Sequence, residues 1–398
     1  MRLGCRFRTP LGEDHAAGDW VSTPDSSGEG KPIRLQGDFL MKRVRGIFEK
    51  VVSKENLERA IMTVVRSHRW VRYADKPNRK AVWLERTLPE RVKELRAIIT
   101  QGFEPSHTRK KRRWDANACK WREIAEPRLW PDQCVHHALI QALEPVMMRG
   151  MDHWCCGSIK NRGAHFGIRG MKKWMGRRGT KWCIEMDIRH FYDSLEPSLV
   201  VGRFRSLIKD RLTLDLIERV LRDGVQIGAY CSQWFANTFL QPLDVLIRSL
   251  GVRFYVRYMD NFTVIVRDKG KCRRVVRLVS KWLHAHGLSL KGNWQWFKVR
   301  DRLPNALGYR FGKGYTLMRK KNLLRLSRNM KRFARLRGRA IPVRFAQGLL
   351  SRLGQLRHCS SVGLYARFVP NDSQRVLKDV VREWQRKEAM RWSMCLAG

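Results

Sequence analysis

Two aspartates at the ends of apolar segments are the residues of this sequence best suited to chemistry. Asp187 ends the apolar run 182–186, and Asp260 lies at the tip of a strand–turn–strand pattern over residues 253–266. If these strands pair in one sheet, the two carboxylates meet at one edge, and carboxylate oxygens are ligands that Mg²⁺ prefers. Two such ions can activate a 3′-hydroxyl and stabilise a pyrophosphate leaving group. For each aspartate taken alone, a turn cap or an ion pair with an arginine is the simpler alternative.

The chain as a whole carries a large excess of positive charge. Its 398 residues include 81 Lys and Arg against 36 Asp and Glu, which gives a formal net charge of +45. Such a charge predicts a polyanionic partner, with nucleic acid well ahead of an anionic membrane surface. Because 43% of the residues are hydrophobic, the chain can still build a core, and its length predicts two or more packed units.

The composition argues against several other classes of protein. The first residues contain no apolar run long enough for a signal peptide, and no run approaches the roughly 20 residues of a membrane span. The ten cysteines are scattered without a CxxC pair, so we expect reduced, mostly buried thiols and no zinc site. A cytoplasmic protein without membrane contact is the resulting expectation.

Helical segments and short strands must hold the two aspartates in place. The apolar spacing predicts a loose leader over residues 1–36 and a helical region over 37–106, followed by a basic, tryptophan-bearing stretch. Asp132 is expected to cap the helix that follows it. Further predicted elements are a strand ending at Asp187, helices at 207–221, 233–250 and 273–286, a turn at 259–261 and basic helices from residue 319.

Several ordered sequence blocks resemble the reverse transcriptases of bacteria. EMDIRHFYDSL, GVQIGAYCSQWFANTFLQPLD and RYMDNFTVIV resemble the first three palm motifs of that family, and LSLKGNWQWF and LGYRF resemble the next two. Upstream, KWREI and CGSIKNRGAHFGI resemble blocks of the fingers. The resemblance spans roughly residues 115–315, and its order and spacing make it more specific than a single short motif.

The resemblance implies an α+β, right-hand polymerase with fingers, palm and thumb. The fingers would cover residues 107–180, and the catalytic palm, built on an antiparallel sheet, would cover 181–315. A basic helical thumb would follow over residues 316–398.

The resemblance also assigns the catalytic and metal-binding residues. Asp187 and Asp260 match the essential metal ligands of the family, and the backbone carbonyl of Ile188 would complete the shell around Mg²⁺, with Mn²⁺ as an alternative ion. The third block departs from the family because Asn261 stands where a second acidic residue is usual. An amide brings no charge, so we expect a lower metal affinity or rate; an RNA-binding scaffold that has lost catalysis is the alternative.

Nucleotide-binding roles are implied for four further residues. Tyr192 matches an aromatic steric gate that would clash with a ribose 2′-hydroxyl and select deoxynucleotides. Lys120 and Arg122 match basic fingers residues that hold the incoming triphosphate, a task suited to arginine. Lys291 is a candidate to protonate the pyrophosphate.

The second palm block suggests a subgroup of the family. Most reverse transcriptases carry Gln-Gly and then Ser-Pro there, whereas this chain has Ile227-Gly228 and then Ser232-Gln233. This form resembles the enzymes of diversity-generating retroelements and of phage defence. Ile227 offers a nucleotide only apolar contact, so weaker geometric discrimination is expected. Gly228 is expected to let the backbone approach the nucleotide.

The first basic helix after the palm is expected to be amphipathic. Leu323, Leu326, Met330 and Phe333 fall on one apolar stripe that would pack inward. The surrounding cations would follow a phosphate backbone; they are Lys321, Arg325, Arg328, Lys331, Arg332 and Arg335.

Together these observations predict an RNA-directed DNA polymerase that makes cDNA from a dedicated RNA in a prokaryotic retroelement or antiphage system. Its partners would be the RNA template, expected to be a dedicated non-coding RNA, the cDNA product and dNTPs, with an accessory protein or a homo-oligomer left open. The alternatives are template-independent or protein-primed DNA synthesis from the same site, and the inactive scaffold.

Overall fold

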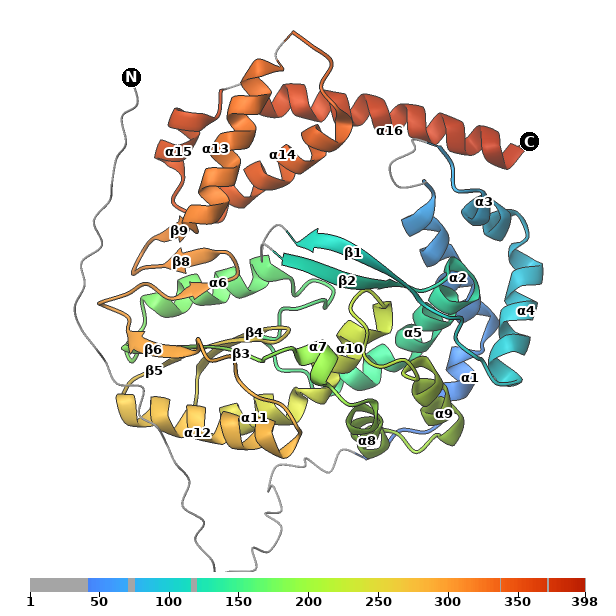
Figure 1. Cartoon of the computed structure of the whole chain (residues 1–398), viewed down its shortest axis with the longest axis horizontal. Helices are drawn as coiled ribbons and strands as arrows, with labels where there is room; N and C mark the ends of the chain where they lie inside the picture. Colours follow the sequence, from blue (N-terminus) through green and yellow to red (C-terminus); the bar gives the residue numbers. More distant parts are fainter. Residues whose placement is uncertain (1–41, 71–75, 116–119, 337, 371, 398) are drawn as a thin grey trace, which may run out of the picture. The chain divides into compact units, whose positions relative to one another are not determined.

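The computed structural model describes residues 42–70, 76–115, 120–336, 338–370 and 372–397 (Figure 1). The expected leader over residues 1–36 lies outside these ranges. All described residues belong to one unit, residues 39–398, which contains more than one hydrophobic cluster. Helices and antiparallel sheets are mixed in this unit, in agreement with the expected α+β class.

A four-stranded antiparallel sheet lies at the centre of the unit, in the strand order β4-β5-β3-β6. Its strands are β3 (Trp182–Asp187), β4 (Phe254–Tyr258), β5 (Asn261–Val266) and β6 (Gln295–Lys298). The β3 and β5 strands pair along their whole length, from Trp182 opposite Val266 to Asp187 opposite Asn261. The strand predicted to end at Asp187 is therefore confirmed.

The alternation of side chains along the strands divides the sheet residues between two hydrophobic clusters. Ile184 and Val264 join the main cluster with Val275 and Val279 of α12 (Lys269–Ala285). On the other face, Cys183 joins a second cluster with residues of α6 (Ala164–Met175). Figure 1 shows α12 below the sheet and α6 above it. The two helices hold the sheet, and thus the aspartates, between two packed layers.

The N-terminal part of the unit is helical, as expected for residues 37–106 where they are described. Its helices are α1 (Ile47–Val51), α2 (Lys54–His68), α3 (Arg79–Arg86) and α4 (Leu88–Thr100). The first two pack mainly against α5 (Cys134–Arg149), and the other two pack mainly against α2. The basic stretch that follows forms an antiparallel hairpin of β1 (Arg109–Asp115) and β2 (Lys120–Glu126).

Three predicted elements differ from the structure. Asp132 does not cap the helix that follows it: it lies in a π-helix, η1 (Leu129–Gln133), and its carboxylate accepts hydrogen bonds from the backbone N–H groups of Ser106 and Arg128. The helix predicted at 207–221 is present as α9 (Arg211–Val220), which begins four residues later than predicted, after α8 (Pro197–Leu207) has ended. Asp210 is the N-cap of α9, and its carboxylate also accepts from two N–H groups of α1, so α9 begins only after Asp210.

The helix predicted at 233–250 is interrupted. It consists of α10 (Tyr230–Phe239) and α11 (Gln241–Ser249), with the break at Leu240. Pro242 lies in the first turn of α11, the position in a helix that tolerates proline because no backbone donor is needed there. The predicted helix at 273–286 is confirmed as α12, which begins slightly earlier.

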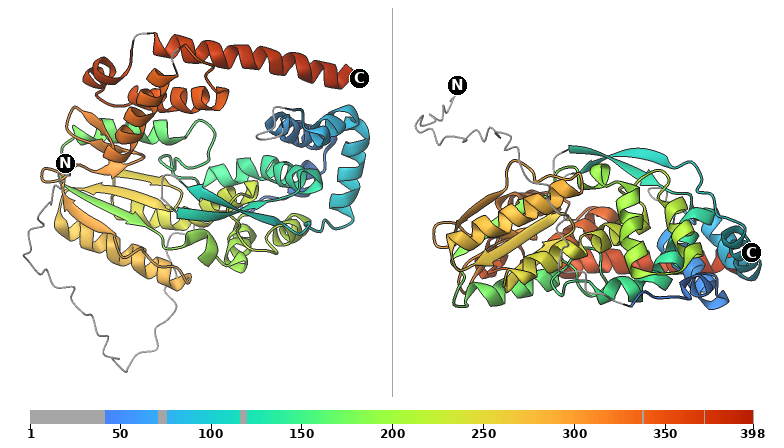
Figure 2. Two further views of the ribbon diagram at one scale, coloured as in Figure 1. Left: turned by 45° about the horizontal axis from the view of Figure 1, so that its top comes forward. Right: turned by 90° about the horizontal axis from the view of Figure 1, so that it is seen from below.

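The C-terminal part continues through a small sheet into four helices. The sheet contains β7 (Asn305–Ala306), β8 (Tyr309–Phe311) and β9 (Thr316–Met318). The helices are α13 (Lys320–Arg335), α14 (Val343–Leu356), α15 (Val362–Phe368) and α16 (Ser373–Ala397). They share a cluster of their own, and Figure 2 shows α16 extending from it toward the N-terminal helices.

The end of α16 contacts the N-terminal helices directly. The Trp392 ring lies 6.4 Å from that of Trp70, and the Arg69 guanidinium lies 5.1 Å from the Trp392 ring. Arg86 of α3 donates to the carbonyl of Cys395 at 2.7 Å. No helix in the described ranges has the length and apolar character needed to cross a membrane.

Candidate active site

Asp187 and Asp260 lie together at one end of the central sheet. Asp187 is the last residue of β3 and is paired with Asn261, the first residue of β5, so that Asp260 immediately precedes its cross-strand partner. The Ile188 N–H donates to the Asp260 carbonyl at 3.2 Å, which joins the two chain segments just beyond the strands. The convergence expected from the sequence is therefore present.

Lys291 forms a direct ion pair with one of these carboxylates. Its Nζ lies 2.5 Å from Asp187 Oδ2, and its backbone N–H donates to the Asp187 carbonyl at 2.8 Å. The second carboxylate oxygen, Asp187 Oδ1, is buried and has no hydrogen-bond partner within the described part of the chain. The residue predicted to act on pyrophosphate thus lies at the aspartate pair.

The two carboxylates influence each other electrostatically. Burial raises the pKa of Asp260, the negative charge of Asp187 raises this pKa further, and the Lys291 ammonium acts in the opposite direction. Asn261 Nδ2 donates to Asp260 Oδ1 at 3.2 Å. Asn261 therefore supplies a hydrogen bond at this end of the sheet and no further negative charge.

These residues fit a divalent cation. Two neighbouring carboxylates repel each other, and one oxygen of Asp187 is buried without a partner, so a hard cation would relieve both conditions. Within the described residues, no group of three or more His, Cys, Asp or Glu side chains forms a metal cluster. A cation here would therefore complete its shell with other oxygen ligands, such as substrate phosphates and water.

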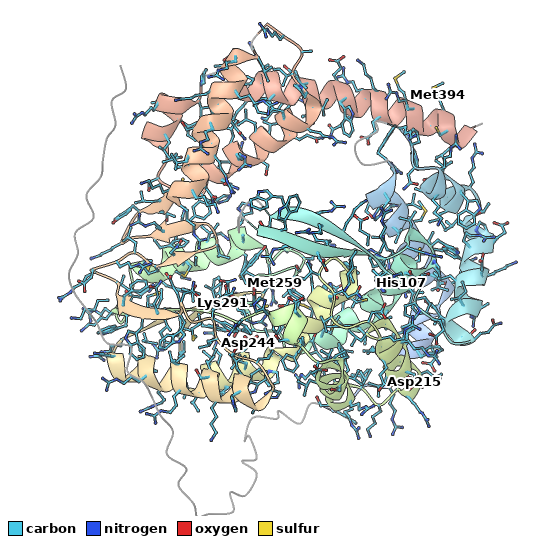
Figure 3. The ribbon with its side chains drawn as sticks, in the orientation of Figure 1. His107, Asp215, Asp244, Met259, Lys291 and Met394 are labelled. Atoms are coloured by element: carbon cyan, nitrogen blue, oxygen red, sulfur yellow. The ribbon has the colours of Figure 1, made fainter. Side chains whose placement is uncertain are left out.

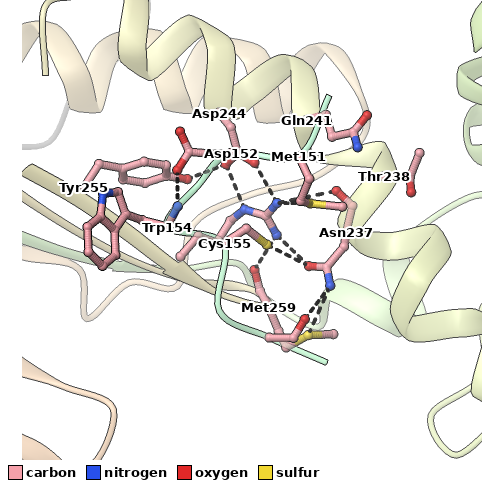
Figure 4. Close-up of polar contacts among 12 residues, drawn as sticks. Met151, Asp152, Trp154, Cys155, Asn237, Thr238, Gln241, Asp244, Tyr255 and Met259 are labelled. Carbon is pink, nitrogen blue, oxygen red and sulfur yellow. Dashed lines mark hydrogen bonds and ion pairs between the residues drawn. The ribbon is translucent and has the colours of Figure 1, made fainter. Parts of the chain in front are cut away.

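A buried polar network supports the turn that carries Asp260 (Figure 4). Arg257 of β4 is fully buried, and its guanidinium contacts Asp244 of α11 at 2.6 and 2.8 Å. Its Nη1 donates to the Asn237 side-chain oxygen at 2.8 Å and to the Met259 carbonyl at 3.3 Å. Burial alone would lower the pKa of Arg257, but the Asp244 carboxylate raises it well above its ordinary value. Burial raises the pKa of Asp244, and the Arg257 guanidinium acts to lower it.

The same network holds Met259 in an uncommon backbone conformation. Met259 has a φ of 55°, in the left-handed region of backbone conformation, which residues other than glycine seldom adopt. Its sulfur lies 3.8 Å from Asn237 Nδ2, and its side chain occupies the space that a Cβ on Gly157 would need. Figure 3 labels Met259, Lys291 and Asp244 in the region between α6 and α12. The direction in which Asp260 leaves the turn is thus set by packing beneath it.

The expected nucleotide-binding residues of the palm and hairpin are only partly brought together. Tyr192 of α7 (Phe191–Ser194) is half-buried, and burial together with the nearby Asp260 charge raises its pKa, whereas Arg122 acts to lower it. Tyr192 is therefore within electrostatic reach of both residues. Arg122 itself pairs with Asp115 across the hairpin at 2.8 Å. Lys120 begins β2, but its side chain lies outside the described residues.

Gly228 has a structural use that the sequence did not indicate. Its φ is 112°, and a Cβ there would lie 2.3 Å from the Ala125 carbonyl oxygen and 2.6 Å from the Ile124 side chain. The Ala125 N–H donates to the Ile227 carbonyl at 2.7 Å. The backbone approach expected toward a nucleotide is occupied here by β2, which docks on this turn.

The remaining members of the second block face different surroundings. Ile227 is half-buried and Gln233 is exposed on α10. Ser232 is buried and lines a small cavity with Asp132 and His136. The Ser232 side chain thus lies in the protein interior.

The expected amphipathic helix is confirmed as α13. Leu326, Met330 and Phe333 are buried in the C-terminal cluster, and Leu323 packs against it. The surrounding cations are exposed with the exception of Arg325, which is half-buried; they are Lys321, Arg325, Arg328, Lys331, Arg332 and Arg335. The Arg332 guanidinium lies 4.9 Å from the Phe345 ring of α14, so part of its contact is within the fold.

Sequence reasoning missed the buried network and one aromatic pair. Arg257 interrupts an otherwise apolar strand, and Asp244 lies on the apolar side of a helix, which together could have indicated a buried ion pair. Trp114 and Trp121 stand in the hairpin, where the spacing places them opposite each other.

Comparisons with known proteins agree with this geometry. Residues 109–298 match the family described as reverse transcriptase (RNA-dependent DNA polymerase). The group II intron-encoded protein LtrA of Lactococcus lactis subsp. cremoris is 23% identical over 179 residues, which cover 42% of this chain and 29% of LtrA. Protein YkfC of Escherichia coli (strain K12) is 22% identical over 251 residues, which cover 51% of this chain and 65% of YkfC.

The chain matches less than two thirds of the length of each of these relatives. The matched segment 109–298 nevertheless includes the hairpin, all four strands of the central sheet, both aspartates and Lys291. Over that segment, this chain is similar to the reverse transcriptase family, which supports a relationship with bacterial reverse transcriptases.

Proposed function

We propose that this chain is an RNA-directed DNA polymerase in which Asp187 and Asp260 hold divalent cations for nucleotidyl transfer. The observation that carries the proposal is the pairing of these carboxylates at one sheet end, inside the segment that matches the family. Mg²⁺, or Mn²⁺ in its place, would supply Lewis-acid activation of a primer 3′-hydroxyl and neutralise the leaving pyrophosphate.

The chain's own residues would position the substrates around this pair. Lys291, held beside Asp187, would deliver a proton to the pyrophosphate oxygen as it leaves. Tyr192 would place its ring against the sugar of the incoming nucleotide, and Arg122 would contact the triphosphate after leaving Asp115. The backbone of Ile188, already bonded to Asp260, would help hold the two carboxylates in register.

In this proposal the hairpin and its neighbours serve as fingers, the central sheet as palm and the helices α13–α16 as thumb. The exposed cations of α13 would contact the phosphate backbone of a primer–template duplex, without reading its sequence. The Ile227-Gly228 and Ser232-Gln233 pattern supports a role in a retroelement or in antiphage defence, where one dedicated RNA is copied.

Primer extension with the full chain tests this proposal. We expect Mg²⁺-dependent incorporation of dNTPs on an RNA template, and a loss of at least about 100-fold for Asp187→Asn or Asp260→Asn. Asp193→Asn is the matched control, because Asp193 is an exposed aspartate close to Asp187 in sequence, and its activity should be unchanged.

Three outcomes would separate the alternatives. Incorporation that does not follow the template sequence would indicate template-independent synthesis. Nucleic-acid binding without incorporation would indicate the inactive scaffold. Equal incorporation by wild type and both aspartate variants would refute the site.

The role of Tyr192 has its own test. Tyr192→Ala should admit ribonucleotides into the product, whereas Tyr192→Phe should still exclude them because the ring is retained. Competition between dNTPs and rNTPs in primer extension measures the difference. Equal discrimination by both variants would contradict the steric role.

A further inference from the structure

Two exposed tryptophans lie side by side on the β1–β2 hairpin. Trp114 and Trp121 are direct cross-strand partners, and their ring centroids lie 5.5 Å apart at an angle of 66°. They are 52% and 57% exposed. Among the described tryptophans only Trp83 is also classed as exposed, at 36%, so this pair is unusual in presenting two large rings to solvent.

The two faces of the hairpin differ because side chains alternate along each strand. One face carries Arg122, Ile124 and the ion pairs of Glu126 with Lys111 and Arg113. Ile124 on this face contacts the Gly228 turn. The tryptophan pair belongs to the opposite face, so it does not dock the hairpin on the palm.

The tryptophan face is also basic. Lys110 and Arg112 share it and are exposed, and the Arg112 guanidinium lies 5.7 Å from the Trp121 ring. One carboxylate, Glu123, stands opposite Arg112. Exposed rings next to cations form the combination that binds single-stranded nucleic acid, with the rings stacking on bases and the cations contacting phosphates.

The size and charge of this face decide between classes of partner. A stable protein interface needs roughly 800 Å² on each side, far more than two rings provide. A base pair inside a duplex hides its flat faces, whereas an unpaired base offers one for stacking. The hairpin face opposite the two tryptophans carries Arg122, which lies within electrostatic reach of Tyr192.

We propose that Trp114 and Trp121 stack on an unpaired base of the template strand, on the face of the hairpin opposite Arg122. That the bound strand is a template rests on the proposed polymerase function; the stacking on single-stranded nucleic acid does not. The hairpin would thereby hold the template in single-stranded form before it pairs with incoming nucleotides.

Binding to two labelled substrates tests the proposal. One is a primer–template duplex with a single-stranded 5′ template extension, and the other is the same duplex with blunt ends; affinity is measured by fluorescence anisotropy. Trp114→Ala/Trp121→Ala should weaken binding of the extended substrate by roughly 5- to 150-fold, the effect of losing one stacked base. Binding of the blunt duplex should be unchanged.

Matched variants separate stacking from a collapsed hairpin. Trp114→Phe/Trp121→Phe keeps two aromatic rings and should retain most of the affinity, and Trp83→Ala removes an exposed tryptophan elsewhere and should have no effect. The slope of affinity against salt concentration should stay constant in the tryptophan variants, because stacking releases no counterions. A double alanine variant that binds the extended substrate like wild type, or loses both substrates equally, would overturn the proposal.

The outcome is distinguishable from failure of the polymerase proposal. Asp187→Asn should abolish extension and still show the tryptophan-dependent binding. If the wild-type protein does not extend primers, but the double variant binds the extended substrate more weakly than wild type does, the polymerase proposal fails and the stacking proposal stands. If primers are extended and the double variant binds normally, the stacking proposal alone fails.

Discussion

Replacing Asp244 should reveal how much stability the fold loses when the buried Arg257, beside the Met259–Asp260 turn, has no counter-ion. The side chains of Arg257 and Asp244 are 0% and 1% exposed, and their closest atoms, Nη2 and Oδ2, lie 2.6 Å apart. Asp244 also accepts a hydrogen bond from the Tyr255 hydroxyl at 2.5 Å. Asp244→Asn keeps the size of the side chain and removes the charge.

The expected cost follows from the buried charge that is left behind. Arginine keeps its charge at neutral pH, so the variant leaves the buried Arg257 guanidinium without a counter-ion in the protein interior. Losing one partner of such a pair lowers the free energy of unfolding by about 3–5 kcal/mol. The exposed pair Arg205–Glu218, also 2.6 Å apart, has side chains that are 64% and 44% exposed. Glu218→Gln should therefore change the free energy of unfolding by at most about 1 kcal/mol.

Urea denaturation followed by far-ultraviolet circular dichroism measures both variants. The double variant Asp244→Asn/Arg257→Met removes the leftover charge as well, so it should be less destabilised than the sum of its single changes, by about 1–3 kcal/mol. If Asp244→Asn lowers the free energy of unfolding no more than Glu218→Gln does, the reasoning from burial is wrong. Strict additivity in the double variant would equally refute a direct charge interaction.

Three further predictions follow from the described contacts. Gly228→Ala should lower the free energy of unfolding by about 1–3 kcal/mol more than Gly224→Ala does. Both glycines have a positive φ, but only at Gly228 would a Cβ meet the Ala125 carbonyl. Equal shifts of the thermal unfolding midpoint in the two variants would contradict this account. Asn261→Asp should lower the Mg²⁺ concentration needed for half-maximal primer extension, because a third carboxylate joins the site. The same repulsion between carboxylates should destabilise the metal-free protein. An unchanged Mg²⁺ requirement would exclude a metal role for this position. Burial lowers the pKa of His136 from 6.5 to about 4, so between these pH values the unfolded chain binds a proton that the folded chain does not. The free energy of unfolding should therefore fall by up to about 1.4 kcal/mol per pH unit as the pH drops from 6.5 toward 4. His136→Asn should flatten this slope in urea titrations, and an unchanged slope would assign the pH dependence to other groups.

Local elements were predictable where one physical pattern dominated. The strand ending at Asp187 and the turn before Asn261 follow from dense β-branched and aromatic residues on both sides of a polar turn. The α13 stripe of Leu326, Met330 and Phe333 follows from helical periodicity. Each of these patterns is contained in a short stretch of sequence, either a few helical turns or a single hairpin.

Predictions failed where an aspartate carboxylate accepts hydrogen bonds from backbone N–H groups outside the predicted helix. Asp132 has the residue type of a helix cap, but the Ser106 and Arg128 N–H groups bind its carboxylate. The helix predicted from residue 207 begins only at Arg211, because Asp210 caps it and also accepts from N–H groups of α1, which is distant in sequence. Periodicity over a local window carries no information about such partners.

The sequence by itself determined which residues could perform chemistry and in what order they occur, because motif spacing and hydrophobic period are properties of the chain alone. It singled out Asp187 and Asp260 on those grounds. Only the tertiary structure decided that Lys291 pairs with Asp187, that Arg257 finds its counter-ion in Asp244 and that β2 fills the space beside Gly228. These contacts join segments far apart in sequence, and side-chain packing and the desolvation of charge select them from many alternatives.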